Sequence, residues 1–287
     1  MPARPAEASF ASPVLNRLKS CQGMQLDEYR KLAEVDDRMW YFHTLNRRYT
    51  RWLLRMIPTD PARLLDAGCG TGGLTQLLQA TVPEWNITGL DFSPLACELA
   101  RARTGVEVVQ GSITAMPFAD ESFDAVLACD VLSQVDDDSQ AVRECVRCVR
   151  PGGPVIANVP AYPWLKSYHD VATETKHRYT KVRLTDMFRA AGLEVVFATY
   201  VNFLPLPLLI ARRKLFKPAN PTSDVHLYPA PLEAAFRALG WLERQWIGRG
   251  WPLPAGSSVF VVGRKPPGRN SVLTAAEKSQ QCVVPTP

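Results

Sequence analysis

The chain has 287 residues, of which 46% are apolar and 21% charged, and its formal net charge at pH 7 is +5. These values are ordinary for a soluble globular protein with a sizeable core, and the mild, dispersed positive charge gives no argument for a nucleic-acid partner. Seven cysteines without a disulfide framework, no signal-peptide pattern and no spanning apolar segment predict a cytoplasmic protein.

The first 60 residues are predicted to precede the main fold. Residues 1–22 are rich in Pro, Ala and Ser, which predicts a disordered tail. Residues 23–60 predict an N-terminal helical cap, with a helical pattern from Leu26 to Ile57. Its aromatic side chains, among them Trp40 and Tyr41, are compatible with a helix that covers a ligand and with one that packs on a sheet.

From residue 61 to 265, short apolar runs alternate with helical segments. Strands are expected at 63–68, 86–91, 106–111, 123–130, 152–160, 193–201 and 257–265, and helices at 71–80, 95–102, 136–150 and 184–191. This alternation predicts an α/β fold with a mostly parallel sheet and helices on both faces. The polar segment 266–287 predicts a second disordered tail.

Two connections are too long for this alternation, at 160–182 and 202–256. Long connections within a compact α/β domain are usually functional, so both are predicted to be substrate-region insertions. The second begins "NFLPLPLLIARRKLFK", an apolar run followed by basic residues. This pattern predicts either a helical cover for a pocket or a peripheral membrane contact through 203–217.

The stretch "LLDAGCGTGG", residues 64–73, places a glycine-rich turn between a strand and a helix. Such a turn lets the backbone approach a ligand closely and points unpaired N–H groups at it. Asp91 ends the next strand, where a carboxylate can accept the hydroxyls of a ribose. These features fit both NAD and S-adenosylmethionine. Asp66 favours the latter, because a carboxylate two residues before the first glycine holds an ammonium group and repels a pyrophosphate.

Further along, "MPFADESFDAV" and "RPGG" follow in order and spacing. Together with the acid-glycine loop and Asp91, they resemble the class I S-adenosylmethionine-dependent methyltransferases, particularly the bacterial small-molecule group that includes the quinone methyltransferases. The resemblance covers roughly residues 63–201 and the last strand. It implies a Rossmann-like, seven-stranded sheet whose last strand is antiparallel. It also implies S-adenosylmethionine as cofactor and methyl transfer to O, N or C of a small hydrophobic or anionic molecule.

The resemblance also implies a set of cofactor-binding residues: Asp66, Gly68, Cys69, Gly70, Asp91, Phe92, Ser112, Ile113 and Cys129. Asp66 and the glycines would line the methionine end of the cofactor, Asp91 the ribose and Phe92 the adenine. Asp130 would lie beside the reacting sulfonium, on the substrate side. Many relatives carry Asp at position 112 and His at position 134, where this chain has Ser112 and Gln134.

The segment "SYHDVATETKHRY" carries the candidate catalytic residues. Because a sulfonium is already an activated methyl donor, a general base is needed only when the attacked atom must lose a proton. His169 and His177 are the candidates for that base. Tyr168, Asp170, Arg178 and Tyr179 are predicted to contact the substrate, with Arg178 as a clamp for an anionic group. The alternative is that these side chains only cross-link a substrate-binding loop.

Cys145 and Cys148 form a C-x-x-C motif, but they follow the spacing of a buried helix face, and no metal site is predicted. The leading hypothesis is therefore a methyltransferase acting on a small molecule. The two alternatives are a non-catalytic S-adenosylmethionine-binding module and an NAD-dependent oxidoreductase. Asp66 disfavours the oxidoreductase, and the histidine-bearing segment favours an enzyme.

Overall fold

The computed structural model describes residues 26–57, 61–215 and 223–267. The predicted tail at 1–22 lies outside these ranges, as does the predicted tail at 266–287 apart from its first two residues.

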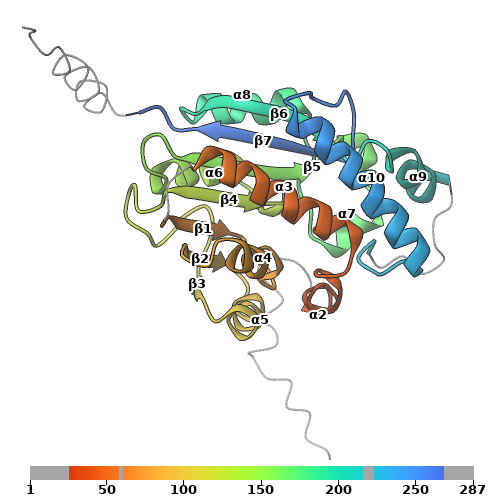
Figure 1. The fold of residues 1–287 in the computed structure, drawn as a ribbon, viewed down its shortest axis with the longest axis horizontal. Coiled ribbons are helices and arrows are strands. Elements are labelled where there is room, and N and C mark those ends of the chain that lie inside the picture. Colours follow the sequence, from red (N-terminus) through yellow and green to blue (C-terminus); the bar gives the residue numbers. More distant parts are fainter. Residues whose placement is uncertain (1–25, 58–60, 216–222, 268–287) are drawn as a thin grey trace, which may run out of the picture.

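In the described part of the chain, seven strands form one sheet in the order β3-β2-β1-β4-β5-β7-β6 (Figure 1). The strands are β1 (Arg63–Ala67), β2 (Asn86–Asp91), β3 (Glu107–Gln110), β4 (Ala125–Cys129), β5 (Pro154–Pro160), β6 (Glu194–Val201) and β7 (Ser258–Arg264). The first five strands pair in parallel, whereas β7 is antiparallel to both β5 and β6. The predicted mostly parallel sheet with an antiparallel last strand is confirmed.

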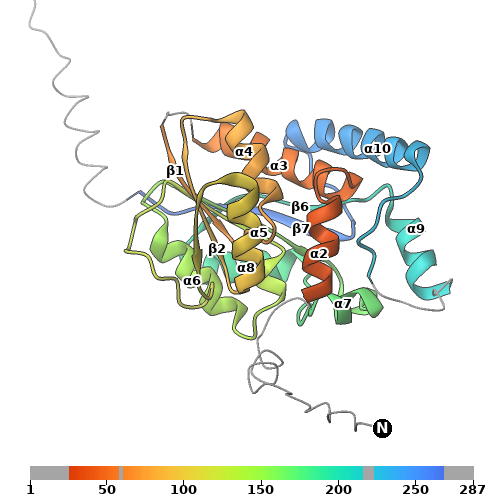
Figure 2. The same ribbon diagram turned by 90° about the horizontal axis from the view of Figure 1, so that it is seen from below.

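Helices cover both faces of this sheet (Figure 1 and Figure 2). The longer helices are α2 (Leu26–Val35), α3 (Trp40–Met56), α4 (Gly73–Thr81), α5 (Pro94–Thr104), α6 (Asp138–Cys148), α8 (Lys181–Ala190) and α10 (Ala230–Gly248). On one face, α3, α4 and α10 share an apolar cluster with Leu64 and Leu127 of the sheet. On the other, α6 and α8 pack with Leu65 and Val126. Neighbouring strand residues thus point to opposite faces, as the two-residue period of a strand requires.

The helix ends follow signals in the sequence. Ser93 Oγ accepts a 3.3 Å hydrogen bond from the N–H of Ala96 at the start of α5, as its capping pattern predicts. Asp137 caps α6 in the same way. Cys145 and Cys148 are buried in the apolar cluster beneath α6, so the prediction that this pair packs in the core is confirmed.

The chain direction across the sheet reverses between β1 and β4, which are neighbours. Chain segments leaving these two strands diverge and open a crevice beyond their carboxyl ends, where ligands of open α/β sheets bind. The first long connection, 160–182, contributes η2 (Pro163–Leu165) and α7 (Tyr168–Ala172). The second, 202–256, contributes α9 (Leu206–Ile210), the π-helical turn η3 (Ala211–Leu215) and α10, which lies along α3 (Figure 1). Among the described residues, no helix combines the length and apolarity needed to cross a membrane.

Candidate active site

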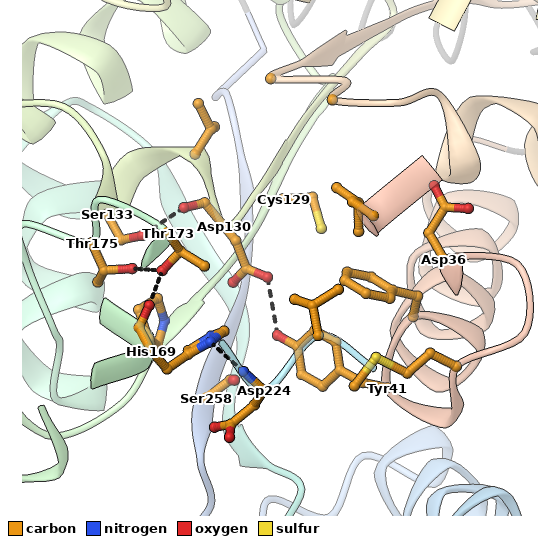
Figure 3. A pocket seen from close by; sticks show the side chains of 18 of the residues that line it. Asp36, Tyr41, Cys129, Asp130, Ser133, His169, Thr173, Thr175, Asp224 and Ser258 are labelled. Carbon is orange, nitrogen blue, oxygen red and sulfur yellow. Dashed lines mark hydrogen bonds between the residues drawn. The ribbon is translucent and has the colours of Figure 1, made fainter. Parts of the chain in front are cut away.

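A cavity of about 640 Å³ lies beyond the carboxyl ends of β1, β2 and β4. This volume is in the range of small-molecule sites, and the position is the one expected from the strand order. The glycine loop and α2 line one part of the cavity, and α7, α9, η3 and α10 line the other. Figure 3 shows side chains from both parts around the same space, from Asp36 to Asp224.

The glycine loop brings the backbone up to the cavity. Gly68 and Gly70 have φ angles of +81° and +54°, in the left-handed region that side chains disfavour. A Cβ on Gly68 would lie 2.5 Å from the Cβ of Val131, so the packing against the end of β4 requires glycine. A Cβ on Gly70, which lines the cavity, would have only Leu32 within 4 Å, at 3.9 Å. A side chain at position 70 would therefore fill ligand space.

Asp91, at the carboxyl end of β2, is held in place by the same loop. Its Oδ2 accepts a 2.9 Å hydrogen bond from the N–H of Gly70, and its Oδ1 accepts from the N–H of Ser93 at 2.9 Å. The Tyr29 hydroxyl of α2 donates to the same Oδ1 at 3.5 Å. Burial raises the pKa of Asp91, and these donors oppose the rise. An ionised carboxylate has about four acceptor positions, so both oxygens can still accept from ribose hydroxyls.

Asp66 has one satisfied carboxylate oxygen and one unsatisfied oxygen. Its Oδ2 accepts a 2.7 Å hydrogen bond from Thr75 Oγ1, whereas the buried Oδ1 has no hydrogen-bond partner among the described residues. Burial raises the pKa of Asp66 to about 6. A buried acceptor without a partner is costly, and a cationic ligand group would satisfy it. The site thus fits the ammonium group of an amino-acid-like ligand and is unsuited to a diphosphate.

The other predicted cofactor residues line the same part of the cavity: Cys69, Phe92, Ser112, Ile113 and Cys129. The ring of Phe92 is 43% exposed and can stack on a planar group. Burial raises the pKa of the Cys69 and Cys129 thiols, so neither is a thiolate nucleophile at neutral pH. Together with Asp66 and Asp91, these residues fit S-adenosylmethionine.

The helices α2 and α3 both reach the cavity, and α3 also packs on the sheet. Asp36, at the end of α2, accepts hydrogen bonds from Thr71 Oγ1 of the glycine loop at 2.5 Å and from Arg103 Nη1 at 2.6 Å. These contacts hold α2 over the cofactor end of the cavity. The start of α3 lines the cavity through Tyr41, and its later turns pack on the sheet through Trp52 and Leu53. The helical stretch predicted at 26–57 is broken at 36–39, between α2 and α3.

Asp130, directly after β4, carries strain and an unusual proton affinity. Its φ is +59°, which is uncommon for a residue other than glycine. Its carboxylate accepts hydrogen bonds from Asn158 Nδ2 at 2.8 Å and from the Tyr41 hydroxyl at 3.0 Å (Figure 3). Burial raises its pKa to about 6. Asn158 was missed by sequence reasoning, although an amide within the apolar run "PVIANVP" was a readable signal.

His169 lines the other part of the cavity, and its tautomer follows from a backbone contact. Its Nδ1 accepts a 3.2 Å hydrogen bond from the N–H of Asp224 (Figure 3). Burial and the nearby Arg213 lower the pKa of His169 to about 4, so the ring is neutral at pH 7. A neutral ring that accepts at Nδ1 carries its proton on Nε2. His169 therefore offers Nε2–H as a hydrogen-bond donor, and its Nδ1 lone pair is already occupied by the N–H of Asp224.

Arg178, predicted to clamp an anionic substrate group, lines the cavity and is also bound to neighbouring groups of the protein. Its Nε and Nη2 bind the two carboxylate oxygens of Asp170 at 2.5 and 3.0 Å, and its Nη1 donates to Ala161 O at 2.8 Å. Both side chains are buried, and although burial opposes it, the guanidinium lowers the pKa of Asp170. These contacts use one N–H of each nitrogen, so Nη1 and Nη2 each keep one N–H.

Two further predicted residues, His177 and Tyr179, do not line the cavity. His177 Nε2 lies 3.3 Å from the carbonyl oxygen of Asp136. The hydroxyl of the fully buried Tyr179 donates to Asp138 at 2.9 Å. These contacts tie the 160–182 connection to α6 and its leading turn.

The guanidinium of Arg212 in η3 also lines the cavity. Its Nη1 donates to the Tyr228 hydroxyl at 3.1 Å and its Nε lies 3.3 Å from Asp224 Oδ1, while Nη2 has no hydrogen-bond partner in the described chain. Arg213 binds the other oxygen of Asp224 through two nitrogens, at 2.6 and 2.9 Å. Two guanidinium groups thus share one carboxylate. Tyr168, a predicted substrate residue, does not line the cavity but donates to Asp224 at 2.8 Å.

The chain is similar to methyltransferases from several bacteria. Residues 65–157 match a family described as a methyltransferase domain. The chain is 34% identical over 119 residues to the ubiquinone biosynthesis O-methyltransferase of Pseudomonas putida, covering 39% of this chain and 50% of that protein. It is 27% identical over 206 residues to the demethylmenaquinone methyltransferase of Listeria monocytogenes, covering 58% of this chain and 86% of that protein. The chain thus spans half the length of the Pseudomonas relative.

The fold is also that of a solved methyltransferase structure. Geranyl diphosphate C-methyltransferase from Streptomyces coelicolor superposes with a TM-score of 0.52 over 78% of this chain and 80% of that one, at 16% identity. At this level of identity the likeness speaks for the fold alone. With the matched domain, the sequence relatives and the residues around the glycine loop taken together, residues 65–157 carry a methyltransferase domain, and the chain is similar to class I S-adenosylmethionine-dependent methyltransferases.

Proposed function

We propose that this protein transfers the methyl group of S-adenosylmethionine directly to a small molecule bound between Asp130 and η3. One observation carries the proposal. A single continuous cavity joins the unsatisfied oxygen of Asp66, which suits the cofactor's ammonium group, to a chamber lined by α9, η3 and α10. A module that only bound the cofactor would have no use for this second chamber.

The cofactor supplies an activated methyl group when bound, so the chain's own task is positioning. In this proposal Asp66 holds the ammonium group of the cofactor and Asp91 holds its ribose. The end of β4 lies between the cofactor part and the second chamber. The chamber is largely apolar where α9 and α10 line it. The lining residues there are Pro205, Leu208, Leu209, Leu232 and Phe236. Such a lining excludes water and orients the acceptor behind the methyl group.

We assign Asp130 as the general base that removes a proton from the molecule to be methylated. A general base works best when its pKa lies near the operating pH, and the pKa of Asp130, about 6, meets that condition. His169, which the sequence suggested for this role, offers an Nε2–H instead, because Asp224 occupies its Nδ1. In this assignment His169 donates to an oxygen of the acceptor and holds it in place.

The acceptor we propose is an apolar molecule with one anionic group. The apolar lining favours a hydrophobic body, and Arg212, with Nη2 unpaired among the described residues, supplies a donor for a carboxylate or phosphate. From the quinone-related relatives we carry over only transfer to a small, largely apolar molecule.

The test is a screen of metabolites with S-adenosylmethionine labelled in its methyl group. We expect label to appear in an extractable, anionic and apolar product, with release of an equal amount of S-adenosylhomocysteine. Tight binding of S-adenosylhomocysteine without turnover on any fraction would instead identify a non-catalytic binding module.

A further inference from the structure

The outward face of α10 is apolar along its whole length. Phe236, Gly240 and Ile247 are buried on the inward side, whereas every exposed residue of this helix is alanine, proline, leucine or tryptophan. Trp241, Leu242 and Trp246 are 50%, 51% and 47% exposed. Just beyond the helix, Trp251 is 50% exposed, and its ring centroid lies 4.6 Å from that of Trp246. We call Trp241, Leu242, Trp246 and Trp251 the α10 face.

Six arginines of α10, of the residue after it and of the neighbouring helix α3 lack counter-charges in the described part of the chain. They are Arg47, Arg51 and Arg55 of α3, and Arg237, Arg244 and Arg249 of α10 and the residue after it. In the ranges that the structure describes, none of the six has a carboxylate oxygen within 4.0 Å. Such a row of unpaired cations is an electrostatic footprint for an anionic surface.

The acids on α10 do not neutralise this row, because both are buried and occupied. Glu233 accepts from the N–H groups of Trp40 and Tyr228 at 2.7 and 3.0 Å. Glu243 accepts from those of Asn202 and Leu204, both at 2.8 Å.

The positive potential is visible in neighbouring groups. Burial, followed by the charges of Arg47, Arg237 and Arg244, lowers the pKa of His43 to about 4. After burial, Arg47 and Arg51 are the causes that lower the pKa of Arg244. These guanidinium groups repel one another, and an external anionic surface would relieve that repulsion.

We propose that the α10 face docks on an anionic lipid bilayer, with its tryptophans and Leu242 in the headgroup boundary and the six arginines against lipid phosphates. A helix that presents tryptophan and leucine on one side and arginines along the flanks has the pattern of an interfacial membrane helix. Each arginine near an anionic leaflet adds attraction. A nucleic acid would match the arginines but offers no apolar phase for Leu242 and the alanines beside it.

The α10 face continues into the cavity. Leu232 of α10 and Leu208 of α9 both line the cavity and are 37% and 54% exposed. Docking would turn this mouth toward the lipid, so that an apolar acceptor reaches the chamber from the bilayer. This delivery step rests on the proposed function, whereas the docking itself does not. The segment 203–217, for which the sequence left a helical pocket cover and a membrane contact open, lines the cavity through Leu208 and Leu209.

The test is co-sedimentation of the full chain with vesicles, without cofactor. We expect partition onto vesicles of phosphatidylglycerol and phosphatidylcholine that is at least about tenfold stronger than onto phosphatidylcholine alone and that weakens in high salt. Leu242→Glu should abolish it. Val182→Glu, at a 65% exposed position of α8 on the opposite face of the sheet, is the matched control and should leave it unchanged.

A second pair of variants separates the arginines from net charge. Arg55→Gln with Arg249→Gln should weaken vesicle binding at least about tenfold, while Arg143→Gln with Arg189→Gln, which removes the same charge from α6 and α8, should not. Unfolding midpoints and S-adenosylhomocysteine affinity report whether each variant is folded. No partition onto anionic vesicles by the folded wild type would overturn the proposal. Two other outcomes, each in the absence of vesicle binding, would also overturn it. One is a dimer that Leu242→Glu dissociates, and the other is a nucleic-acid complex that the Arg55 and Arg249 double variant no longer forms.

Discussion

Tyr41 and Asp130, 89 residues apart in the chain, are joined by a 3.0 Å hydrogen bond from the tyrosine hydroxyl to the carboxylate (Figure 3). The bond ties α3 to the end of β4, where the two parts of the cavity meet. Burial raises the pKa of Tyr41 well above its usual value, so the hydroxyl stays a donor, and burial raises that of Asp130 to about 6. A helix from outside the matched domain thus tunes the group that we assign as proton acceptor.

Asp130→Asn tests that assignment. Asparagine keeps the size and an oxygen acceptor but cannot take up a proton, so turnover should fall by about 100-fold or more while S-adenosylhomocysteine affinity stays within the wild-type range. With the acceptor found in the methyl-transfer screen, the wild-type rate should rise with pH through about 6. That rising limb should be missing from the variant, and its persistence would show that another group takes the proton.

Tyr41→Phe gives the matching prediction. Its hydroxyl lowers the pKa of Asp130 by stabilising the carboxylate, so removing it should raise that pKa and move the rising limb to higher pH. The pH–rate profile measures the displacement. A profile that drops in height without moving would indicate that Tyr41 only shapes the pocket.

Asp66→Asn should make the folded chain relatively more stable near neutral pH and weaken its binding of the cofactor. The pKa of Asp66 in the folded chain is about 6, above its ordinary 3.8, so the proton-linked stabilisation is complete below pH 3.8 and is lost as the pH rises through 6. This loss of unfolding free energy amounts to about 3 kcal/mol, and Asp66→Asn does not show it because the amide does not titrate. The stability of the wild type relative to the variant should therefore fall between pH 4 and pH 7.

Denaturant unfolding of both proteins at pH 4 and pH 7 measures how their difference in unfolding free energy changes with pH. A destabilisation by the asparagine that is the same at both pH values cancels in this comparison. Saturating S-adenosylhomocysteine should restore the wild type at pH 7 and have little effect on the variant, because its ammonium group is the expected partner of the free oxygen. A relative stability that does not change with pH would contradict the buried, unpaired state of Asp66.

Gly70→Val should remove cofactor binding without unfolding the protein. The side chain would project into the cavity, where only Leu32 is within 4 Å of its first carbon. The positive φ adds a cost of about 1–2 kcal/mol. Gly105→Val is the matched control, since Gly105 also has positive φ, +69°, and open space around it, at the end of α5. Calorimetry should show binding by the control and none by Gly70→Val, and equal losses would point to strain as the cause.

Arg212 and Arg178 should respond in opposite ways to substitution. Arg212→Gln should leave the unfolding midpoint nearly unchanged and raise the KM for an anionic acceptor about tenfold, since it removes a charged donor at the cavity wall. Arg178→Met should lower the unfolding free energy by about 3–5 kcal/mol, because it leaves Asp170 buried without its partner. An Arg212 variant with unchanged KM would exclude it from acceptor binding.

The cofactor half of the site was readable from the sequence because its signals are local. Asp66 and the glycines lie within one turn, and Asp91 ends the next strand, so strand order alone brings them together. The acceptor half was not readable in the same way. Its contacts, such as Asp224 to His169, join separate connections whose packing has no short-range pattern.

The two arginines illustrate the limit. The sequence predicts Arg178 as the anion clamp and offers Arg212 only as one of the basic residues after an apolar run. How strongly each is bound to a buried carboxylate depends on the tertiary structure. Arg178 has both oxygens of Asp170, whereas Arg212 must share Asp224 with Arg213. The direction of the His169 ring likewise depends on a backbone N–H that lies 55 residues away.

The central claim is that the pocket behind the glycine loop receives an amino-acid-like adenosyl ligand at Asp66. Calorimetric titration of the purified chain with S-adenosylhomocysteine, and separately with NAD, tests it most directly. The account predicts saturable binding of S-adenosylhomocysteine that Asp66→Asn weakens, and no measurable binding of NAD. Binding of NAD in place of S-adenosylhomocysteine would contradict it.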